Sequence, residues 1–167
     1  MRIGYCALLL IGAHAAAGAG TATDAPAATA GPLAAFNQAL IGATRQMDNG
    51  AAAALWEADG ISLLPGTAPL VGRRAIRAYM DSVTAQMPGA TMQRFELRCA
   101  GQQVSGSWAS EWCLEHQVVD LGSGKPPFDG WGHLLLVLHR AGDGRWRLSR
   151  EMWNQAEPQT APDTPAR

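Results

Sequence analysis

The feature that most constrains the fold is a pair of long, apolar-rich runs near the end of the chain, separated by a short turn. The runs cover residues 131–140 and 145–155, and the segment between them contains Asp143-Gly144. An Asp-Gly pair between two such runs is a strong signal for a β-hairpin. The second run also carries aromatic, charged and amide side chains: Trp146, Arg150, Glu151, Trp153 and Asn154. We therefore expect a long hairpin in a curved sheet that encloses a small pocket.

Three helices are predicted before the hairpin. Apolar residues recur at helical spacing from Leu33 to Met47, and again from Ile76 to Met87. Between these segments, Asp48 is placed to cap a short alanine-rich helix over residues 49–56. Asp59-Gly60 ends the second of these segments, and Pro88-Gly89 stops the third.

Short strands are expected at residues 61–64 and 68–71, and long strands follow residue 90. The strand over 108–121 has one face made of Trp112, Leu114, His116 and Val118. This order of elements predicts an α+β fold, in which a cone-shaped, curved antiparallel sheet wraps around three helices and leaves a cavity between the layers.

The composition divides the chain into segments. A positive Met1-Arg2 start, an apolar run over residues 3–17 and small residues after it predict a secretory signal peptide rather than a buried N-terminal helix. We expect a secreted, periplasmic protein that is not attached to a membrane after cleavage, because the run is shorter than the ~20 residues that span a bilayer. The predicted segments are a signal peptide at 1–20, a flexible lead-in at 21–31, one α+β domain at 32–156 and a disordered tail at 157–167.

Four short stretches resemble the nuclear-transport-factor-2-like superfamily, and in particular its SnoaL-like and ketosteroid-isomerase-like domains. They are residues 55–60, residues 64–76, the Asp143-Gly144 hairpin with Trp146, and the ending Glu151-Met-Trp153-Asn154, in which Glu replaces the family's Asp. The resemblance covers nearly all of the expected domain. It implies the cone-shaped fold, an inward acidic side chain at Glu151 and frequent dimerisation.

One feature of the family is missing. Ketosteroid isomerases donate a hydrogen bond to the substrate from a tyrosine on a helix, whereas the first predicted helix here has none. Tyr79, in the third helix, is the only tyrosine after the signal segment. The scaffold can therefore be carried over to this chain, but the steroid isomerase mechanism cannot.

Glu151 and His116 are the candidates for acid and base roles. A carboxylate in an apolar pocket has a raised pKa and can transfer protons, and a histidine titrates near neutral pH. The simpler interpretation of His116 is a buried histidine that is hydrogen-bonded to a neighbour. Arg150 and Glu151 are adjacent on a strand, so one of them faces the pocket unless a bulge intervenes. An inward Arg150 would bind a ligand carboxylate, and a structural salt bridge across the sheet is a third possibility.

The remaining candidates would shape the pocket for a small apolar or aromatic molecule: Tyr79, Trp112, Trp131, Trp153 and Asn154. A net charge of -1, from 13 basic and 14 acidic residues, gives no reason to expect nucleic acid as a partner. We expect no metal, since His133 and His139 lie roughly 20 Å apart on an extended strand, and no organic cofactor. A non-catalytic module that binds a ligand, or that forms a homodimer through the open sheet face, is the alternative function.

The two cysteines of the predicted domain, Cys99 and Cys113, lie in neighbouring strands, and a secreted location permits a disulfide. A three-residue turn over 105–107 places them opposite each other but sets Leu97 against Glu115. A two-residue turn over Ser105-Gly106 sets Leu97 against Leu114 and places the cysteines on different faces. A bulge would satisfy both demands, so the pairing stays open at this point.

Overall fold

The computed structural model describes residues 31–122 and 124–158. The expected signal peptide over 1–20 lies outside these residues. So do most of the expected lead-in over 21–31 and most of the expected tail over 157–167.

Three helices form close to where the apolar periodicity predicts them. They are α1 (Ala34–Arg45), α2 (Asn49–Ala54) and α3 (Arg73–Ala85). The predicted N-cap of α2 is confirmed, because the Asp48 side chain accepts a hydrogen bond from the backbone N–H of Ala51 at 2.9 Å. The helix ends earlier than predicted, since Trp56 is already the buried first residue of the next strand. Among the described residues, no helix has the length and apolar character that a membrane crossing requires.

Six strands form one sheet. They are β1 (Trp56–Leu63), β2 (Leu70–Val71), β3 (Thr91–Ser105), β4 (Trp108–Asp120), β5 (Phe128–Arg140) and β6 (Trp146–Ala156). Their order across the sheet is β2-β1-β6-β5-β4-β3. The four long strands pair antiparallel as expected, whereas β1 runs parallel to β6. Local sequence patterns do not predict that pair, because the partner of β1 lies far along the chain.

Strand β1 is longer than the prediction. It begins at Trp56 and continues through Asp59-Gly60, the pair predicted to end the preceding helix. The pairing of β1 with β6 shifts register between Trp56 and Ile61, which marks an irregularity in the strand. A Cβ atom on Gly60 would lie 2.6 Å from the Trp56 ring, so only glycine permits this close approach.

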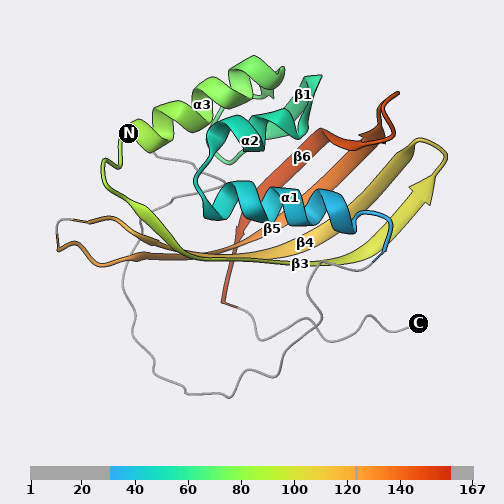
Figure 1. Ribbon diagram of the computed structural model, residues 1–167. Coiled ribbons are helices and arrows are strands. Elements are labelled where there is room, and N and C mark those ends of the chain that lie inside the picture. The colour runs from blue at the N-terminus through green and yellow to red at the C-terminus, as the bar shows by residue number, and fades with distance from the viewer. Residues whose placement is uncertain (1–30, 123, 159–167) are drawn as a thin grey trace.

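The three helices lie on one side of the sheet, which curves around them (Figure 1). The main core fills the space between these two layers and includes Phe36, Trp56, Ile76, Phe95, Leu136 and Trp153. The α+β fold with a curved sheet around three helices is therefore confirmed.

A bulge in β3 decides how β3 and β4 face each other. The turn between them has two residues, because Ser105 pairs with Trp108, and the register then shifts between Ala100 and Gln103. Gly101 lies in this bulge with a φ of 64°, a conformation that favours glycine.

Beyond the bulge, Cys99 stands opposite Cys113 and Leu97 stands opposite Glu115. The two cysteines form a disulfide. The turn is Gly106-Ser107, which differs from both predicted turns, and the bulge brings the two cysteines opposite each other. The predicted pairing of Leu97 with Leu114 does not occur, and Glu115 lies on the same inward face as Leu97.

Candidate active site

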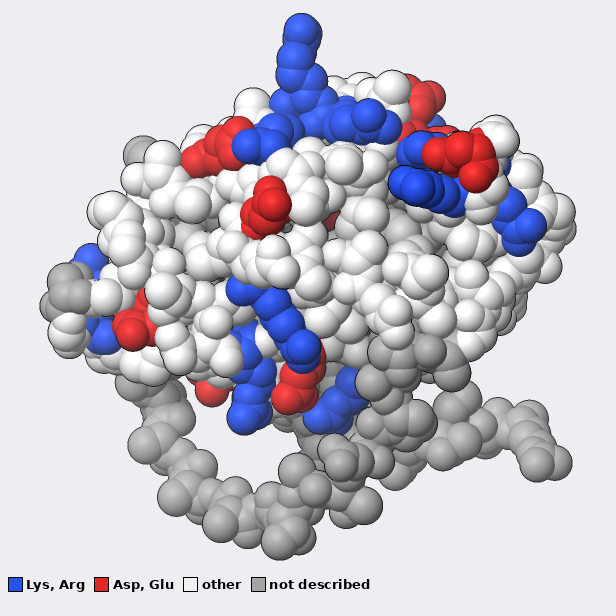
Figure 2. Space-filling view, in the orientation of Figure 1, with Lys and Arg blue, Asp and Glu red and all other residues white. Residues whose placement is uncertain are grey.

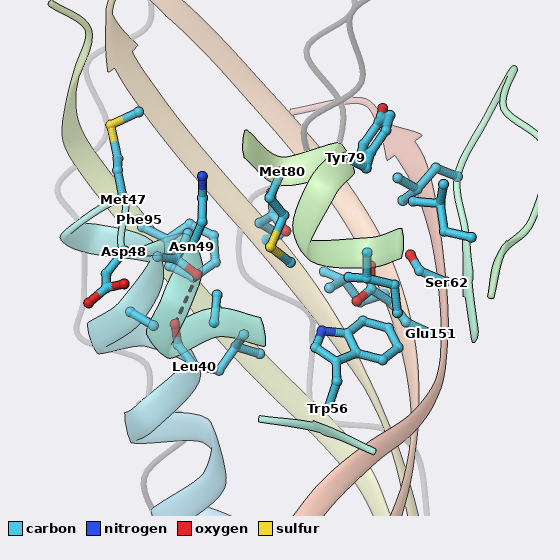
Figure 3. A pocket seen from close by; sticks show the side chains of 18 of the residues that line it. Leu40, Met47, Asp48, Asn49, Trp56, Ser62, Tyr79, Met80, Phe95 and Glu151 are labelled. Carbon is cyan, nitrogen blue, oxygen red and sulfur yellow. Dashed lines mark hydrogen bonds between the residues drawn. The ribbon is translucent and has the colours of Figure 1, made fainter. Parts of the chain in front are cut away.

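A cavity of about 70 Å³ lies between the helices and the inner face of the sheet. Figure 3 shows Trp56, Ser62 and Glu151 on one side of it, and Asn49 and Phe95 on the other. Further apolar side chains complete the wall, including Leu40, Met47, Leu64, Ile76, Met80 and Leu134. Its size is well below the roughly 300–1,000 Å³ of pockets that hold drug-sized ligands.

Glu151 is part of the cavity wall and Arg150 is not. Strand β6 has an irregularity before these residues, because Val137 pairs with Arg150 while Leu138 pairs with Leu148. This bulge allows Leu148 and Glu151 to be buried although they are three positions apart in the chain. Glu151 is 7% exposed, as an inward side chain at this position would be.

Arg150 is exposed and lies away from the cavity. Its Nη1 donates hydrogen bonds to the carbonyl oxygen of Ser149 at 2.7 Å and to the Ser149 hydroxyl at 3.1 Å. Arg150 is therefore not placed to bind a ligand carboxylate in the cavity.

Glu115, which the sequence analysis did not select, also lies in the cavity wall. Glu115 is 1% exposed, and neither of its carboxyl oxygens has a hydrogen-bond partner among the described residues. Burial raises the pKa of Glu115 to about 8, and the negative charge of Glu151 adds to this increase. Glu115 consequently keeps its proton at neutral pH.

The cavity thus holds two carboxyl groups in different surroundings. Glu115 is a proton donor at neutral pH, and a negative charge on Glu151 opposes ionisation of Glu115. A carboxyl group that keeps its proton can donate it, and a neighbouring carboxylate can accept one.

The other polar groups around the cavity are neutral or lie toward its rim. Gln117 on β4 and Ser62 on β1 are buried lining residues. The Asn49 side chain donates to Asp81 and to Thr84, each at 2.9 Å, which holds α2 against α3. Asp48 is exposed and also lines the cavity. Among the described residues of the wall there is no Lys, Arg or His.

His116 lies on the outer face of β4 and takes no part in the cavity wall. Its Nε2 is 2.9 Å from an Asp129 carboxyl oxygen, and its ring stacks on Trp131 with centroids 3.9 Å apart. These contacts match the simpler interpretation, a buried histidine with a hydrogen-bonded neighbour. Because strand residues alternate between faces, Glu115 faces the cavity only if His116 faces away.

The predicted pocket residues are divided between the two faces of the sheet. Tyr79 lines the cavity, whereas Trp112, Trp131 and Asn154 do not. Trp112 is 38% exposed and Asn154 is exposed. Trp153 is buried in the core, where its ring lies over Gly132: a Cβ atom there would be 2.1 Å from the indole Nε1. The predicted residues that the structure brings together at the cavity are therefore Glu151 and Tyr79.

The pairing of Cys99 with Cys113 is the sequence feature from which Glu115 could have been predicted as a cavity residue. Phe95 and Leu97 mark the inward face of β3, and Cys99 shares that face. A disulfide to Cys113 then requires Cys113, and with it Glu115 and Gln117, to point inward. The outer face of β4 is the more apolar one, which is why hydrophobicity alone selected His116.

One group of possible metal ligands occurs among the described residues. Atoms of Cys99, Glu111 and Cys113 lie within 4.8 Å of one another. The two sulfurs are bonded to each other, which leaves the Glu111 carboxyl as the remaining donor. Asn37 and Gln102 donate hydrogen bonds to that carboxyl at 3.3 and 2.8 Å, so it already has neutral partners.

No family model matches the chain, and no curated protein matches it. Solved structures do match it in fold. A ketosteroid isomerase-like protein from Erwinia carotovora atroseptica aligns with a TM-score of 0.64 and 19% identity, over 74% of this chain and 93% of that one.

Two further structures cover similar shares. A proposed dehydratase of the NTF2-like family from Streptomyces avermitilis has a TM-score of 0.62 and 21% identity, over 75% of this chain and 94% of its own. A proposed calcium/calmodulin-dependent protein kinase type II association domain from Thiobacillus denitrificans has a TM-score of 0.56 and 20% identity, over 75% and 95%. At these identities the likeness establishes the nuclear-transport-factor-2-like fold, as the sequence motifs predicted.

Proposed function

We propose that the protein binds a small, largely apolar molecule in the cavity and transfers protons on it with side chains alone. The observation that carries the proposal is the protonated, unpartnered Glu115 carboxyl in an apolar wall that also contains Glu151. Proton-transfer enzymes use such pairs, because the two groups must hold opposite protonation states at the same pH.

Each carboxyl group has a role in this proposal. Glu151 removes a proton from a carbon of the substrate, and Glu115 donates its proton to an oxygen on the same molecule. Isomerisation, cyclisation and dehydration all combine these two steps. The fold-level likeness to a ketosteroid isomerase-like protein and to a proposed dehydratase is compatible with this reaction class. His116, the earlier candidate for the second role, is replaced by Glu115.

A small ketone tests the proposal without knowledge of the substrate. Butan-2-one has few enough atoms for the cavity, and enolisation exchanges the hydrogens beside its carbonyl for deuterium in D₂O. We expect the protein to accelerate this exchange, measured by proton NMR. Glu151→Gln should reduce the acceleration by on the order of 100-fold, the scale of a general base contribution.

The matched control is Glu96→Gln, which changes a partly exposed glutamate paired with Arg94 and Arg98 on β3. This variant should retain the full exchange rate. Equal rates for the wild-type protein, Glu151→Gln and buffer alone would rule out the proposed chemistry for this probe class.

We also propose that the protein is exported, as the N-terminal sequence pattern indicates. Mass spectrometry of the protein recovered from the periplasm should show a new N-terminus between residues 15 and 25. A soluble protein that retains Met1 would contradict this expectation.

A second candidate function is assembly through the outer face of the sheet. Exposed apolar side chains form a continuous row across four paired strands: Trp112, Leu135, Met152 and Leu63. Contiguous apolar surface of this kind marks interaction sites. The fold-level likeness to a proposed kinase association domain fits the same idea. We propose a homodimer as the occupant of this face, and binding in the cavity does not exclude it.

A further inference from the structure

We propose that the ligand of the cavity carries a positive charge, and that its chemical class is a small apolar ammonium ion. The inference rests on the proposed function, because it names the substrate class of the same site. Three features support it: the signs of the charges in the wall, a buried carboxyl without a partner, and the size and aromatic character of the remaining surface.

The titratable side chains in the described cavity wall can carry negative charge but no positive charge. Four titratable side chains line it: Asp48 at the start of α2, Tyr79 on α3, Glu115 on β4 and Glu151 on β6. The described wall contains no Lys, Arg or His, so nothing there would pair with a carboxylate or phosphate ligand. On the adjacent helix α3, Arg77 forms an ion pair with Asp81 at 2.8 Å, and Arg73 donates a hydrogen bond to the carbonyl oxygen of Trp56. In Figure 2, Lys and Arg gather over α3 beside acidic side chains, while the middle of this face carries few charges.

The Glu115 carboxyl supplies the second observation. It is 1% exposed, and neither oxygen has a hydrogen-bond partner among the described residues. A buried polar group in this condition destabilises the fold, because it has lost its hydrogen bonds to water without gaining others. An ammonium group brings up to three N–H donors, so it satisfies the carboxyl and offers a charge to Glu151 at the same time.

The apolar part of the wall fits the rest of such a ligand. The Trp56 and Phe95 rings and the sulfur of Met80 border the space (Figure 3). Aromatic faces attract cations, most strongly where water is excluded. A cavity of about 150 Å³ holds benzene, and this one measures about 70 Å³. A ligand with about five non-hydrogen atoms, such as a butylammonium ion, is therefore the appropriate probe.

Binding of a cation should also release a proton. A positive charge beside Glu115 favours the ionised form of that carboxyl and lowers its pKa from about 8. At pH 7 Glu115 is protonated in the free protein, so the proton would pass to the buffer when the ligand binds. At pH 9 the carboxyl is already ionised, so the release should disappear and binding of the ammonium ion should strengthen.

The experiment compares three probes of nearly equal size on the full chain by titration calorimetry at pH 7: butylamine, butan-1-ol and butyrate. We expect butylamine to bind at least about tenfold more tightly than butan-1-ol, and butyrate to bind more weakly than either. The heat of butylamine binding should differ between buffers of different ionisation enthalpy. Tighter binding of butan-1-ol or butyrate, or no binding of butylamine, would overturn the proposal.

Variants show which carboxyl group causes the preference for butylamine and which one releases the proton. Glu151→Gln should remove most of the preference for butylamine over butan-1-ol, and Glu115→Gln should abolish the buffer dependence of the heat. Glu96→Gln, on the outer face, should change neither. Circular dichroism checks that each variant is folded, and the buffer comparison on the wild-type protein needs no variant at all.

The outcomes separate this inference from the proposed function. If butylamine is preferred but the protein does not accelerate deuterium exchange, the charge selectivity stands and the proton-transfer chemistry fails. If exchange is accelerated through Glu151 but butan-1-ol binds as well as butylamine, the chemistry stands and the ammonium class is wrong.

Discussion

At the scale of single residues, Glu115 makes the stability of the fold depend on pH. Its pKa is about 8 in the native protein, whereas an unperturbed glutamate has a pKa of 4.5. Below pH 4.5 the carboxyl is protonated in both the folded and the unfolded state, so it does not favour either. Between pH 4.5 and 8 the unfolded chain releases the proton while the native protein keeps it, which favours unfolding increasingly. Above pH 8 the penalty is constant.

Replacing the carboxyl should remove this dependence. We expect Glu115→Met, which nearly conserves the volume, to be more stable than the wild-type protein, with the difference growing from pH 5 to 8 toward an order of 4 kcal/mol. Urea unfolding at several pH values measures it. Glu96→Met, on the exposed outer face, is the control and should show no comparable trend. A difference that stays constant over this range would show that Glu115 titrates normally.

Gly132 is a second residue with a measurable role. A Cβ atom there would lie 2.1–2.7 Å from three atoms of the Trp153 indole, and that ring is enclosed in the core. Gly132→Ala should therefore lower the free energy of unfolding by about 1–3 kcal/mol, the usual cost of overpacking. Thermal unfolding provides the measurement. Gly142→Ala, with no atom within 4 Å of its Cβ position, should leave the melting temperature nearly unchanged.

At the scale of elements, the sequence predicts where strands lie better than which way they face. The apolar stripes of the helices, the Asp48 cap and the long C-terminal hairpin are predictable, because each depends on residues that are close together in the sequence. Strand β4 is different, because Leu114 and His116 on one face and Cys113 and Glu115 on the other are all buried. Hydrophobicity cannot distinguish two buried faces, so the cavity residue on β4 depends on pairing with β3.

The disulfide holds this pairing, and its removal should be costly. Cys99 and Cys113 close a loop with a sequence separation of 14 residues, and a loop of about that length gives roughly 3 kcal/mol in the chain-entropy model. We expect the double variant Cys99→Ala and Cys113→Ala to lose stability on this scale in urea unfolding. A reducing agent should destabilise the wild-type protein by a similar amount and leave the double variant unaffected. Equal stability of the oxidised wild-type protein and the variant would contradict the prediction.

At the scale of the whole molecule, the described residues place three helices over one face of a six-stranded sheet and no helix over the other (Figure 1). The layer arrangement was predictable from the order of elements and the family motifs. The parallel pairing of β1 with β6 was not, since it joins the two ends of the domain. The inward orientation of Glu151 agrees with the motif at the end of the chain, whereas Glu115 belongs to no motif and emerges only from the assembled sheet.

The exposed row on the outer face leads to a prediction about assembly. Leu135 lies between Trp112 and Met152 in the row, so Leu135→Lys should place a charge in the centre of a dimer interface and convert the protein to a monomer. Light scattering after size-exclusion chromatography measures the mass. Val104→Lys replaces an exposed apolar residue near the end of β3 and should leave the dimer intact. A wild-type protein that is monomeric at high concentration would refute assembly through this face.

The bulge at Gly101 sets the register in which β3 pairs with β4. Without the extra residue, β3 would meet β4 one position out of step, and Leu97 would stand opposite His116 instead of Glu115. Strand β4 keeps an unbroken register with β5, so the side chains that change face would be those of β3 before the bulge. Phe95 would then leave the cavity wall, and a charged neighbour, Arg94 or Glu96, would take its place. Related chains could thereby change the charge of the cavity wall by inserting or deleting one residue outside it.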